Sequence, residues 1–167
     1  MTRPCTVVVM GVSGCGKTTL ARALADHLGW PFIEGDAYHS DANRQKMASG
    51  QPLDNADRQS WIAALTDAAR AAGPACVVAC SALNPVVRGW IEDGIGHAPL
   101  YLLLEGERDL LAERLTRRPG HFMPPGLLDS QLAALEPPAE AVAIPVTLPT
   151  DAQLPLALEE IRKRMDF

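Results

Sequence analysis

The sequence predicts an α/β fold in which a five-stranded parallel sheet carries helices on both faces. Short apolar runs, such as CTVVVM at residues 5–10, are typical of strands that are covered on both sides. Longer segments with apolar residues at helical spacing lie between these runs. Strands that alternate with helices favour parallel pairing, so the two observations together predict the fold class.

The expected elements alternate along the chain. Strands are expected at residues 5–10, 31–34, 76–80, 99–104 and 143–148. Helices are expected at residues 18–28, 41–49, 55–72, 107–117 and 154–165, with a short one after Pro85. Residues 117–126 contain three prolines and two glycines and are expected to form a mobile lid between helices. We expect one domain over residues 1–167.

The overall charge argues against nucleic acid as a partner. The net charge is −5 and the pI is about 5.3, whereas nucleic-acid binders are typically basic. No stretch approaches the ~20 apolar residues of a membrane span, and the first apolar run stops at Gly11 without a signal-peptide cleavage site. The cysteines lack zinc-site spacing, which favours reduced, buried thiols. We therefore expect a cytoplasmic protein with no membrane partner.

Residues 11–18 read GVSGCGKT and match the phosphate-loop (P-loop) pattern GxxxxGK[ST] at every fixed position. Glycines let successive backbone N–H groups turn toward an anion, and the following helix adds its positive N-terminal end. Lys17 is expected to reach the β- and γ-phosphates, and the Thr18 hydroxyl is expected on Mg²⁺. The pattern thus predicts ATP and Mg²⁺, with nucleotide contacts from Gly11, Val12, Ser13, Gly14, Cys15, Gly16, Lys17, Thr18 and Thr19.

Two carboxylates follow the second expected strand, at the sheet edge where α/β proteins bind ligands. Asp36 is expected to hold and orient an attacking hydroxyl, and Glu34 is expected near the metal, through a water. Alternatively, Asp36 caps the helix after Tyr38. Its position at a strand end favours the catalytic role.

Several further polar residues are candidates for the acceptor site. His39, Asn43 and Lys46 recur at helical spacing and form either a polar rim of the site or a solvated face, and the spacing alone favours the solvated face. Arg58 either grips a carboxylate or pairs with Asp54. Two more candidates are Ser81, which otherwise caps the next helix, and Arg88 on that helix.

A cationic cluster surrounds the expected lid. It consists of Arg114, Arg117, Arg118 and His121. Closing such a lid over ATP would exclude water and neutralise phosphate charge in the transition state. This role is expected for Arg114 and Arg118, with Arg118 catalytic, whereas the alternative is an ordinary solvated charge run.

Taken together, the motifs resemble those of the gluconokinase family of small P-loop kinases. The matching stretches are residues 11–18, GDAYH at 35–39, KMASGQPL at 46–53, Asp57-Arg58 with Trp61, CSAL at 80–83, RPGHF at 118–122 and LEPP at 135–138. They span nearly the whole chain in the family's order.

The resemblance implies a P-loop kinase fold with a mobile lid. It implies phosphorylation of D-gluconate to 6-phospho-D-gluconate by direct transfer from ATP with Mg²⁺, often in a homodimer. Acceptor contacts are expected from Asp36, His39, Lys46, Arg58, Ser81, Arg88 and His121. The chain departs from the family at Asn84, where Lys is usual, and at Val87, where Tyr is usual. A kinase for another hydroxy acid such as shikimate, or a non-catalytic ATP-binding module, are the alternatives.

Overall fold

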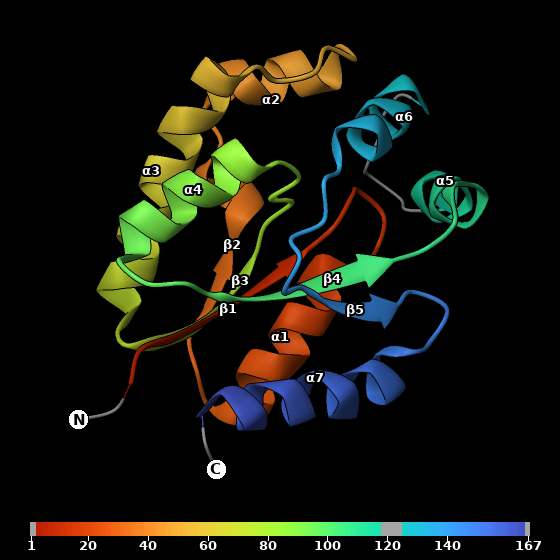
Figure 1. Ribbon diagram of the computed structural model, residues 1–167. Coiled ribbons are helices and arrows are strands. Elements are labelled where there is room, and N and C mark those ends of the chain that lie inside the picture. Colours follow the sequence, from red (N-terminus) through yellow and green to blue (C-terminus); the bar gives the residue numbers. More distant parts are fainter. Residues whose placement is uncertain (1–2, 118–124, 166–167) are drawn as a thin grey trace.

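The computed structural model describes residues 3–117 and 125–165. At the centre of this part of the chain is a sheet of five parallel strands in the order β2-β3-β1-β4-β5 (Figure 1). The strands are β1 (Cys5–Met10), β2 (Phe32–Glu34), β3 (Ala75–Ala79), β4 (Leu100–Glu105) and β5 (Val142–Pro145). The expected five-stranded parallel sheet is confirmed.

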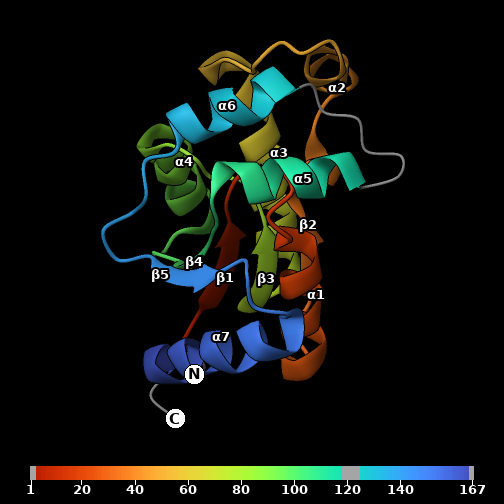
Figure 2. The same cartoon turned by 90° about the vertical axis from the view of Figure 1, so that its right-hand side faces the viewer.

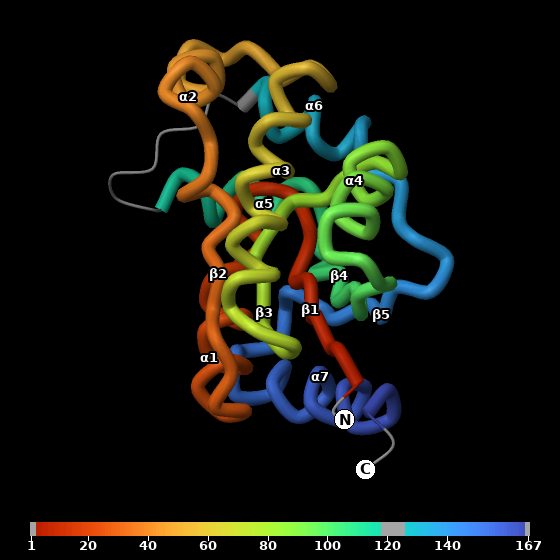
Figure 3. The backbone as a smooth tube through the Cα atoms, turned by 90° about the vertical axis from the view of Figure 1, so that its left-hand side faces the viewer, coloured from red at the N-terminus to blue at the C-terminus, as the bar shows by residue number. Residues whose placement is uncertain are grey.

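Helices cover both faces of the sheet and the end at which its strands finish. Helices α1 (Lys17–Leu28) and α7 (Thr150–Met165) lie on one face, and α3 (Asn55–Ala72) and α4 (Pro85–Ile95) lie on the other (Figures 1 and 3). The remaining helices are α2 (Asp41–Ala48), α5 (Arg108–Arg117), α6 (Pro125–Ala134) and the short 3₁₀ turn η1 (Gly35–Tyr38). Figure 2 shows α5 and α6 crossing beyond the carboxyl ends of the strands.

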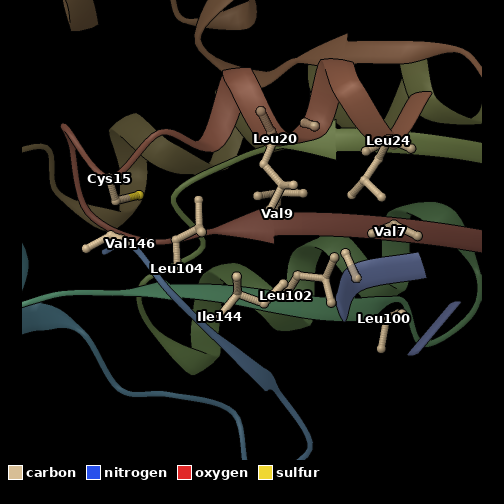
Figure 4. Packing of buried hydrophobic residues seen from close by; sticks show 14 of the residues in the cluster. Val7, Val9, Cys15, Leu20, Leu24, Leu100, Leu102, Leu104, Ile144 and Val146 are labelled. Atoms are coloured by element: carbon tan, nitrogen blue, oxygen red, sulfur yellow. The ribbon is translucent and has the colours of Figure 1, made fainter. Parts of the chain in front are cut away.

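The central strand β1 is apolar along its length, without alternation, because both of its faces are buried. Val7 and Val9 point to the core shared with α1 and α7, where they lie among Leu20, Leu24 and residues of β4 and β5 (Figure 4). Val8 and Met10 belong to the opposite core, under α3 and α4. All four are fully buried, because both faces of a parallel sheet are covered. This buried strand leads directly into the P-loop, which begins at Gly11.

Most boundaries lie within one residue of the sequence prediction, and the larger differences concern three elements. Strand β5 ends at Pro145 instead of residue 148, and α7 begins at Thr150 instead of residue 154. Helix α6 begins at Pro125, inside the run expected to be a loop, because proline is well suited to a first helical position. The intervening residues 118–124 lie outside the described part of the chain. Within the described part, none of the helices has the length and apolar character needed to cross a membrane.

Candidate active site

The P-loop requires its glycines for two separate reasons. Gly11, Gly14 and Gly16 have φ values of 146°, 84° and 93°, which residues with side chains rarely adopt. A Cβ atom on Gly14 would also lie 2.9 Å from Cγ of Leu115, because α5 packs directly on the loop. The backbone conformation of the loop and its contact with α5 therefore fix the positions of the motif residues.

The positive groups of the P-loop gather at the start of α1. Lys17 Nζ donates to the carbonyl oxygens of Gly11 and Val12, at 3.0 and 3.1 Å, so its ammonium group is folded back over the loop. Gly16 caps α1 without any side-chain hydrogen bond to the first turn. The first N–H groups of α1 are consequently available to an anion, as they are in helix-terminal phosphate sites.

Thr18 and Glu34 form an oxygen pair beside this anion site. The Thr18 hydroxyl donates to Glu34 Oε2 at 2.5 Å, which leaves the hydroxyl lone pairs for a cation. Magnesium is commonly held by one or two protein oxygens together with phosphates and waters, so this donor set fits Mg²⁺. Among the described residues there is no cluster of three or more His, Cys, Asp or Glu side chains that would form a metal cage.

Two further predicted nucleotide-contact residues, Cys15 and Thr19, differ in their exposure. The Cys15 side chain is buried against the core near Leu104 and Val146 (Figure 4), so its thiol does not face the solvent. Thr19 is exposed on the first turn of α1. Their nucleotide contacts stay predictions.

A cavity of ≈ 620 Å³ extends from the P-loop under α2, α3 and α6. Its lining comes from the P-loop, η1, α2, the segment before α3, α3 itself, the segment between β3 and α4, and α6. The polar residues that line the cavity are Ser13, Lys17, Asp36, His39, Arg44, Arg58, Ser81, Asn84, Ser130 and Gln131. The cavity thus joins the P-loop lysine to most of the acceptor residues predicted from the sequence.

Asp36 lies on η1 and lines this cavity, and its side chain is 77% exposed. Two contacts fix the turn that carries it. A Cβ on Gly35 would lie 2.3 Å from the carbonyl oxygen of Ala79, so only glycine lets η1 pack on the end of β3. Trp61 Nε1 donates to the Gly35 carbonyl at 2.8 Å. The alternative in which Asp36 caps a helix is wrong, because the side chain of Ser40 caps α2.

His39 is buried between Asp36 and the core. Its ring stacks on Trp61 with centroids 4.0 Å apart, and its Nε2 lies 3.8 Å from Asp36 Oδ1. Burial lowers the pKa of His39, although the Asp36 carboxylate opposes this, so the ring is neutral at pH 7. No described residue pairs with its Nδ1. The solvated-face interpretation is therefore wrong for His39.

The same interpretation fails for Asn43, which is also buried. Its Nδ2 donates to the carbonyl oxygen of Asp57 at 2.9 Å and so ties α2 to α3. Lys46 is partly exposed, and its Nζ lies 2.6 Å from Asp57 Oδ2. This ion pair raises the pKa of Lys46 and lowers that of Asp57. Lys46 is not among the cavity-lining residues, so its contact with the acceptor stays a prediction.

Two arginines line the cavity. Half-buried Arg58 donates to Asn55 Oδ1 at 3.5 Å, and no described ion pair joins it to Asp54. Burial lowers the pKa of Arg58, but a guanidinium remains charged at neutral pH. Arg44, on α2, donates to the Ala37 carbonyl at 3.1 Å. Sequence reasoning missed Arg44, because an arginine on a polar helix face carries no signal of which face borders a cavity.

The segment between β3 and α4 also reaches the cavity. Ser81 lines it, and the helix-cap alternative is wrong because the Asn84 side chain caps α4 by accepting from Val87 N–H at 2.9 Å. Asn84 and Val87 both line the cavity, so the two departures from the family pattern alter the acceptor side. Buried Arg88 instead donates to the carbonyl of Ala82 at 2.8 Å.

That contact gives Arg88 a structural task. Ala82 has a φ of 47°, a conformation that is unfavourable for a residue with a side chain. Arg88 satisfies its carbonyl group from within the protein and is not among the cavity-lining residues. A direct contact of Arg88 with the acceptor stays a prediction.

Two of the four cationic residues predicted around the lid, Arg114 and Arg117, lie in the part of the chain that the structure describes. Arg114 Nη2 donates to the carbonyl of Val146 at 2.7 Å, which joins α5 to the segment after β5. Arg117 pairs with Glu113 on the surface of α5. Arg118 and His121 lie outside the described residues.

Helix α6 supplies a wall of the cavity that the sequence prediction did not include. Its lining residues are Leu127, Ser130, Gln131 and Ala134. Gln131 Oε1 accepts a hydrogen bond of 2.7 Å from the backbone N–H of Ser13, so α6 touches the P-loop itself. The proline at its first position and the paired Leu127 and Leu128 were the available signals for this helix.

The parallel sheet, the P-loop and a cavity that joins the loop to a carboxylate define a P-loop kinase. A family model described as an AAA domain matches residues 7–138. The gluconokinase of Gluconobacter oxydans is 48% identical over 83% of this chain and 79% of its own length. The thermoresistant gluconokinase of Escherichia coli is 34% identical over 93% of each chain.

A solved structure extends the likeness to three dimensions. A gluconokinase from Sinorhizobium meliloti superposes with a TM-score of 0.87 at 38% identity, over 99% of this chain and 96% of that one. The chain belongs to the gluconokinase family.

Proposed function

We propose that this protein transfers the γ-phosphoryl group of ATP to the C6 hydroxyl of D-gluconate and releases 6-phospho-D-gluconate. The observation that carries the proposal is the single cavity that joins Lys17 of the P-loop to Asp36 and two arginines. The family relatives named as gluconokinases support the choice of acceptor.

The polar residues of the cavity suit the functional groups of an open-chain sugar acid. Asp36 would accept the proton of the attacking hydroxyl and hold its oxygen toward the γ-phosphate. Arg58 and Arg44 would bind the carboxylate, since a planar guanidinium can make two parallel hydrogen bonds to it. Ser81 and Asn84 would offer hydrogen bonds to the other hydroxyl groups.

Charge that develops on the transferred phosphoryl group would be met by groups already in place. The N–H groups at the start of α1 are preorganised by the loop, and Lys17 would exchange its two loop carbonyls for phosphate oxygens. Thr18 would hold Mg²⁺, with Glu34 close enough to bind one of its waters. When bound, the ion supplies neutralisation of phosphate charge. Arg114 and Arg118 would add positive charge from the lid side.

His39 would support Asp36 rather than bind phosphate. Its buried, neutral ring lies beside the carboxylate and is fixed by stacking on Trp61. A cation here would attract Asp36 and weaken it as a base, so a neutral ring suits the proposed role. We further propose contacts of Lys46, Arg88 and His121 with the acceptor side, a homodimer, and a cytoplasmic location.

The direct test is detection of the product. Purified protein with Mg·ATP and D-gluconate should release ADP and yield gluconate phosphorylated at C6, identified by ³¹P and ¹³C NMR. Omission of gluconate is the control for simple ATP hydrolysis. ADP release that does not depend on gluconate, without any phosphorylated acid, would contradict the proposal, whereas phosphorylation of shikimate alone would reassign the acceptor.

A further inference from the structure

We propose that Gln131 switches its side-chain amide from the P-loop to the acceptor when ATP binds, and so couples the two substrates. The proposal rests on the proposed kinase function and names a residue that the sequence analysis did not include. Its basis is the hydrogen bond of 2.7 Å from Ser13 N–H to Gln131 Oε1, which joins two segments 118 positions apart in the chain.

The donor in this bond belongs to the phosphate site. Ser13 lies in the P-loop, whose backbone N–H groups cradle the phosphates in proteins of this kind. Together with Lys17, it is a P-loop residue that lines the acceptor cavity, and in the proposal its N–H binds an oxygen of the terminal phosphate. A γ-phosphate oxygen and Gln131 Oε1 therefore compete for the same donor.

The phosphate should win this competition. An ionised oxygen accepts a shorter and roughly twofold stronger hydrogen bond than a neutral amide oxygen. ATP must nevertheless break the hydrogen bond between Ser13 N–H and Gln131 Oε1. The loss of one neutral hydrogen bond lowers the affinity for ATP by about two- to tenfold.

Helix α6 stays in place when this bond breaks, because other contacts hold it. Arg108 on α5 binds the carboxylate of Asp129 through two nitrogens, at 2.6 and 3.2 Å. Leu128 is buried in the core, and Glu136 N–H donates to the carbonyl of Leu83 at 2.8 Å. Only the half-buried side chain of Gln131 has to move.

The released amide then faces the acceptor. Gln131 lines the cavity, and its amide offers two N–H donors and one carbonyl acceptor, which suits the hydroxyl groups of a sugar acid. Acceptor affinity should therefore increase when ATP is bound, and by linkage ATP affinity should increase by the same factor when the acceptor is bound.

The test compares three variants by isothermal titration with a non-hydrolysable ATP analogue and Mg²⁺, in the absence of acceptor. Gln131→Ala should bind the analogue about two- to tenfold more tightly than wild type and ADP with unchanged affinity. Gln131→Glu should bind the analogue more weakly, because its carboxylate holds Ser13 N–H more firmly and repels the γ-phosphate. The control Gln59→Ala, the same substitution at an exposed glutamine of α3 that is not among the cavity-lining residues, should match wild type.

A second measurement examines the acceptor side. In wild type, D-gluconate should bind more tightly in the presence of the ATP analogue, and Gln131→Ala should lose most of this increase and show a higher KM for gluconate. Thermal unfolding confirms that each variant is folded. Unchanged or weaker binding of the analogue by folded Gln131→Ala would overturn the proposal. Because the nucleotide titration contains no acceptor, that result is separate from any failure of gluconate as the substrate.

Discussion

The phosphate side and the acceptor side of the cavity are built in opposite ways. The P-loop is one continuous segment, residues 11–18, between a fully buried strand and the helix it begins. The acceptor side takes its polar groups from η1, α2, α3, the segment before α4, and α6, which the fold brings together from more than half of the chain. Phosphate binding is thus a local property of the sequence, whereas acceptor selection depends on tertiary structure.

The two sides should also differ in how well they tolerate amino-acid substitutions. The P-loop tolerates little change, because its backbone angles and its contact with Leu115 exclude side chains at Gly11 and Gly14. The acceptor wall can exchange single residues, as Asn84 illustrates, since that side chain both caps α4 and lines the cavity. Changes on the two sides should therefore separate kinetically.

The largest effect is expected at Lys17. Lys17→Ala should abolish measurable turnover while the protein stays folded, because the side chain contacts two loop carbonyls and contributes little packing. Coupled ADP release gives the rate, and circular dichroism with thermal unfolding gives the fold. Near-normal turnover in a folded variant would refute the assignment of the phosphate side.

The next effect is expected where the two sides meet. Asp36→Asn should lower kcat by ~10²–10⁴-fold, because the amide keeps the shape of the side chain but cannot accept the hydroxyl proton. Binding of the ATP analogue should change little, since the side chain is largely exposed and no hydrogen bond or ion pair joins it to the described P-loop residues. If ATP affinity falls and kcat does not, Asp36 belongs to the phosphate side.

A smaller effect, confined to the acceptor side, is expected at Arg58. Arg58→Met should raise the KM for gluconate by ~10–100-fold, the value of a charged hydrogen-bonded contact, and should leave ATP affinity unchanged. Arg70→Met on the same helix is the matched control, because Arg70 pairs with Asp67 at the surface and should leave KM unchanged. A fall in kcat at constant KM would remove Arg58 from acceptor binding.

The smallest effect concerns pH and stability. Burial lowers the pKa of His39 in the folded state, and the neighbouring charges of Asp36 and Arg44 modify this less. Just below the ordinary pKa of histidine, ~6.5, the unfolded chain therefore binds a proton that the folded chain does not, and stability rises with pH. The slope of unfolding free energy between pH 5 and 7, from urea titrations, should be lower in His39→Gln. An equal slope would contradict burial of a neutral ring.

The fold and the phosphate side could be predicted from the sequence because their signals are local. The bounds of β1 and the P-loop follow from a six-residue apolar run and a fixed motif. On the acceptor side, Asp36 and Ser81 could be predicted because each follows a strand end, and Arg58 was a candidate near the start of an expected helix. Arg44 and Gln131 were missed, because helix α2 and helix α6 reach the cavity through packing that their own sequences do not encode. The burial of His39 and Asn43 was missed for the same reason.

The central claim is that the acceptor side selects an anionic, open-chain sugar acid. Its most direct test is the ratio of kcat/KM for D-gluconate to that for D-glucose, measured by ADP release under saturating Mg·ATP. Glucose lacks the carboxylate that Arg58 and Arg44 would bind, so we expect a ratio of ~10⁴ or more in favour of gluconate. Comparable values for the two sugars would contradict the claim.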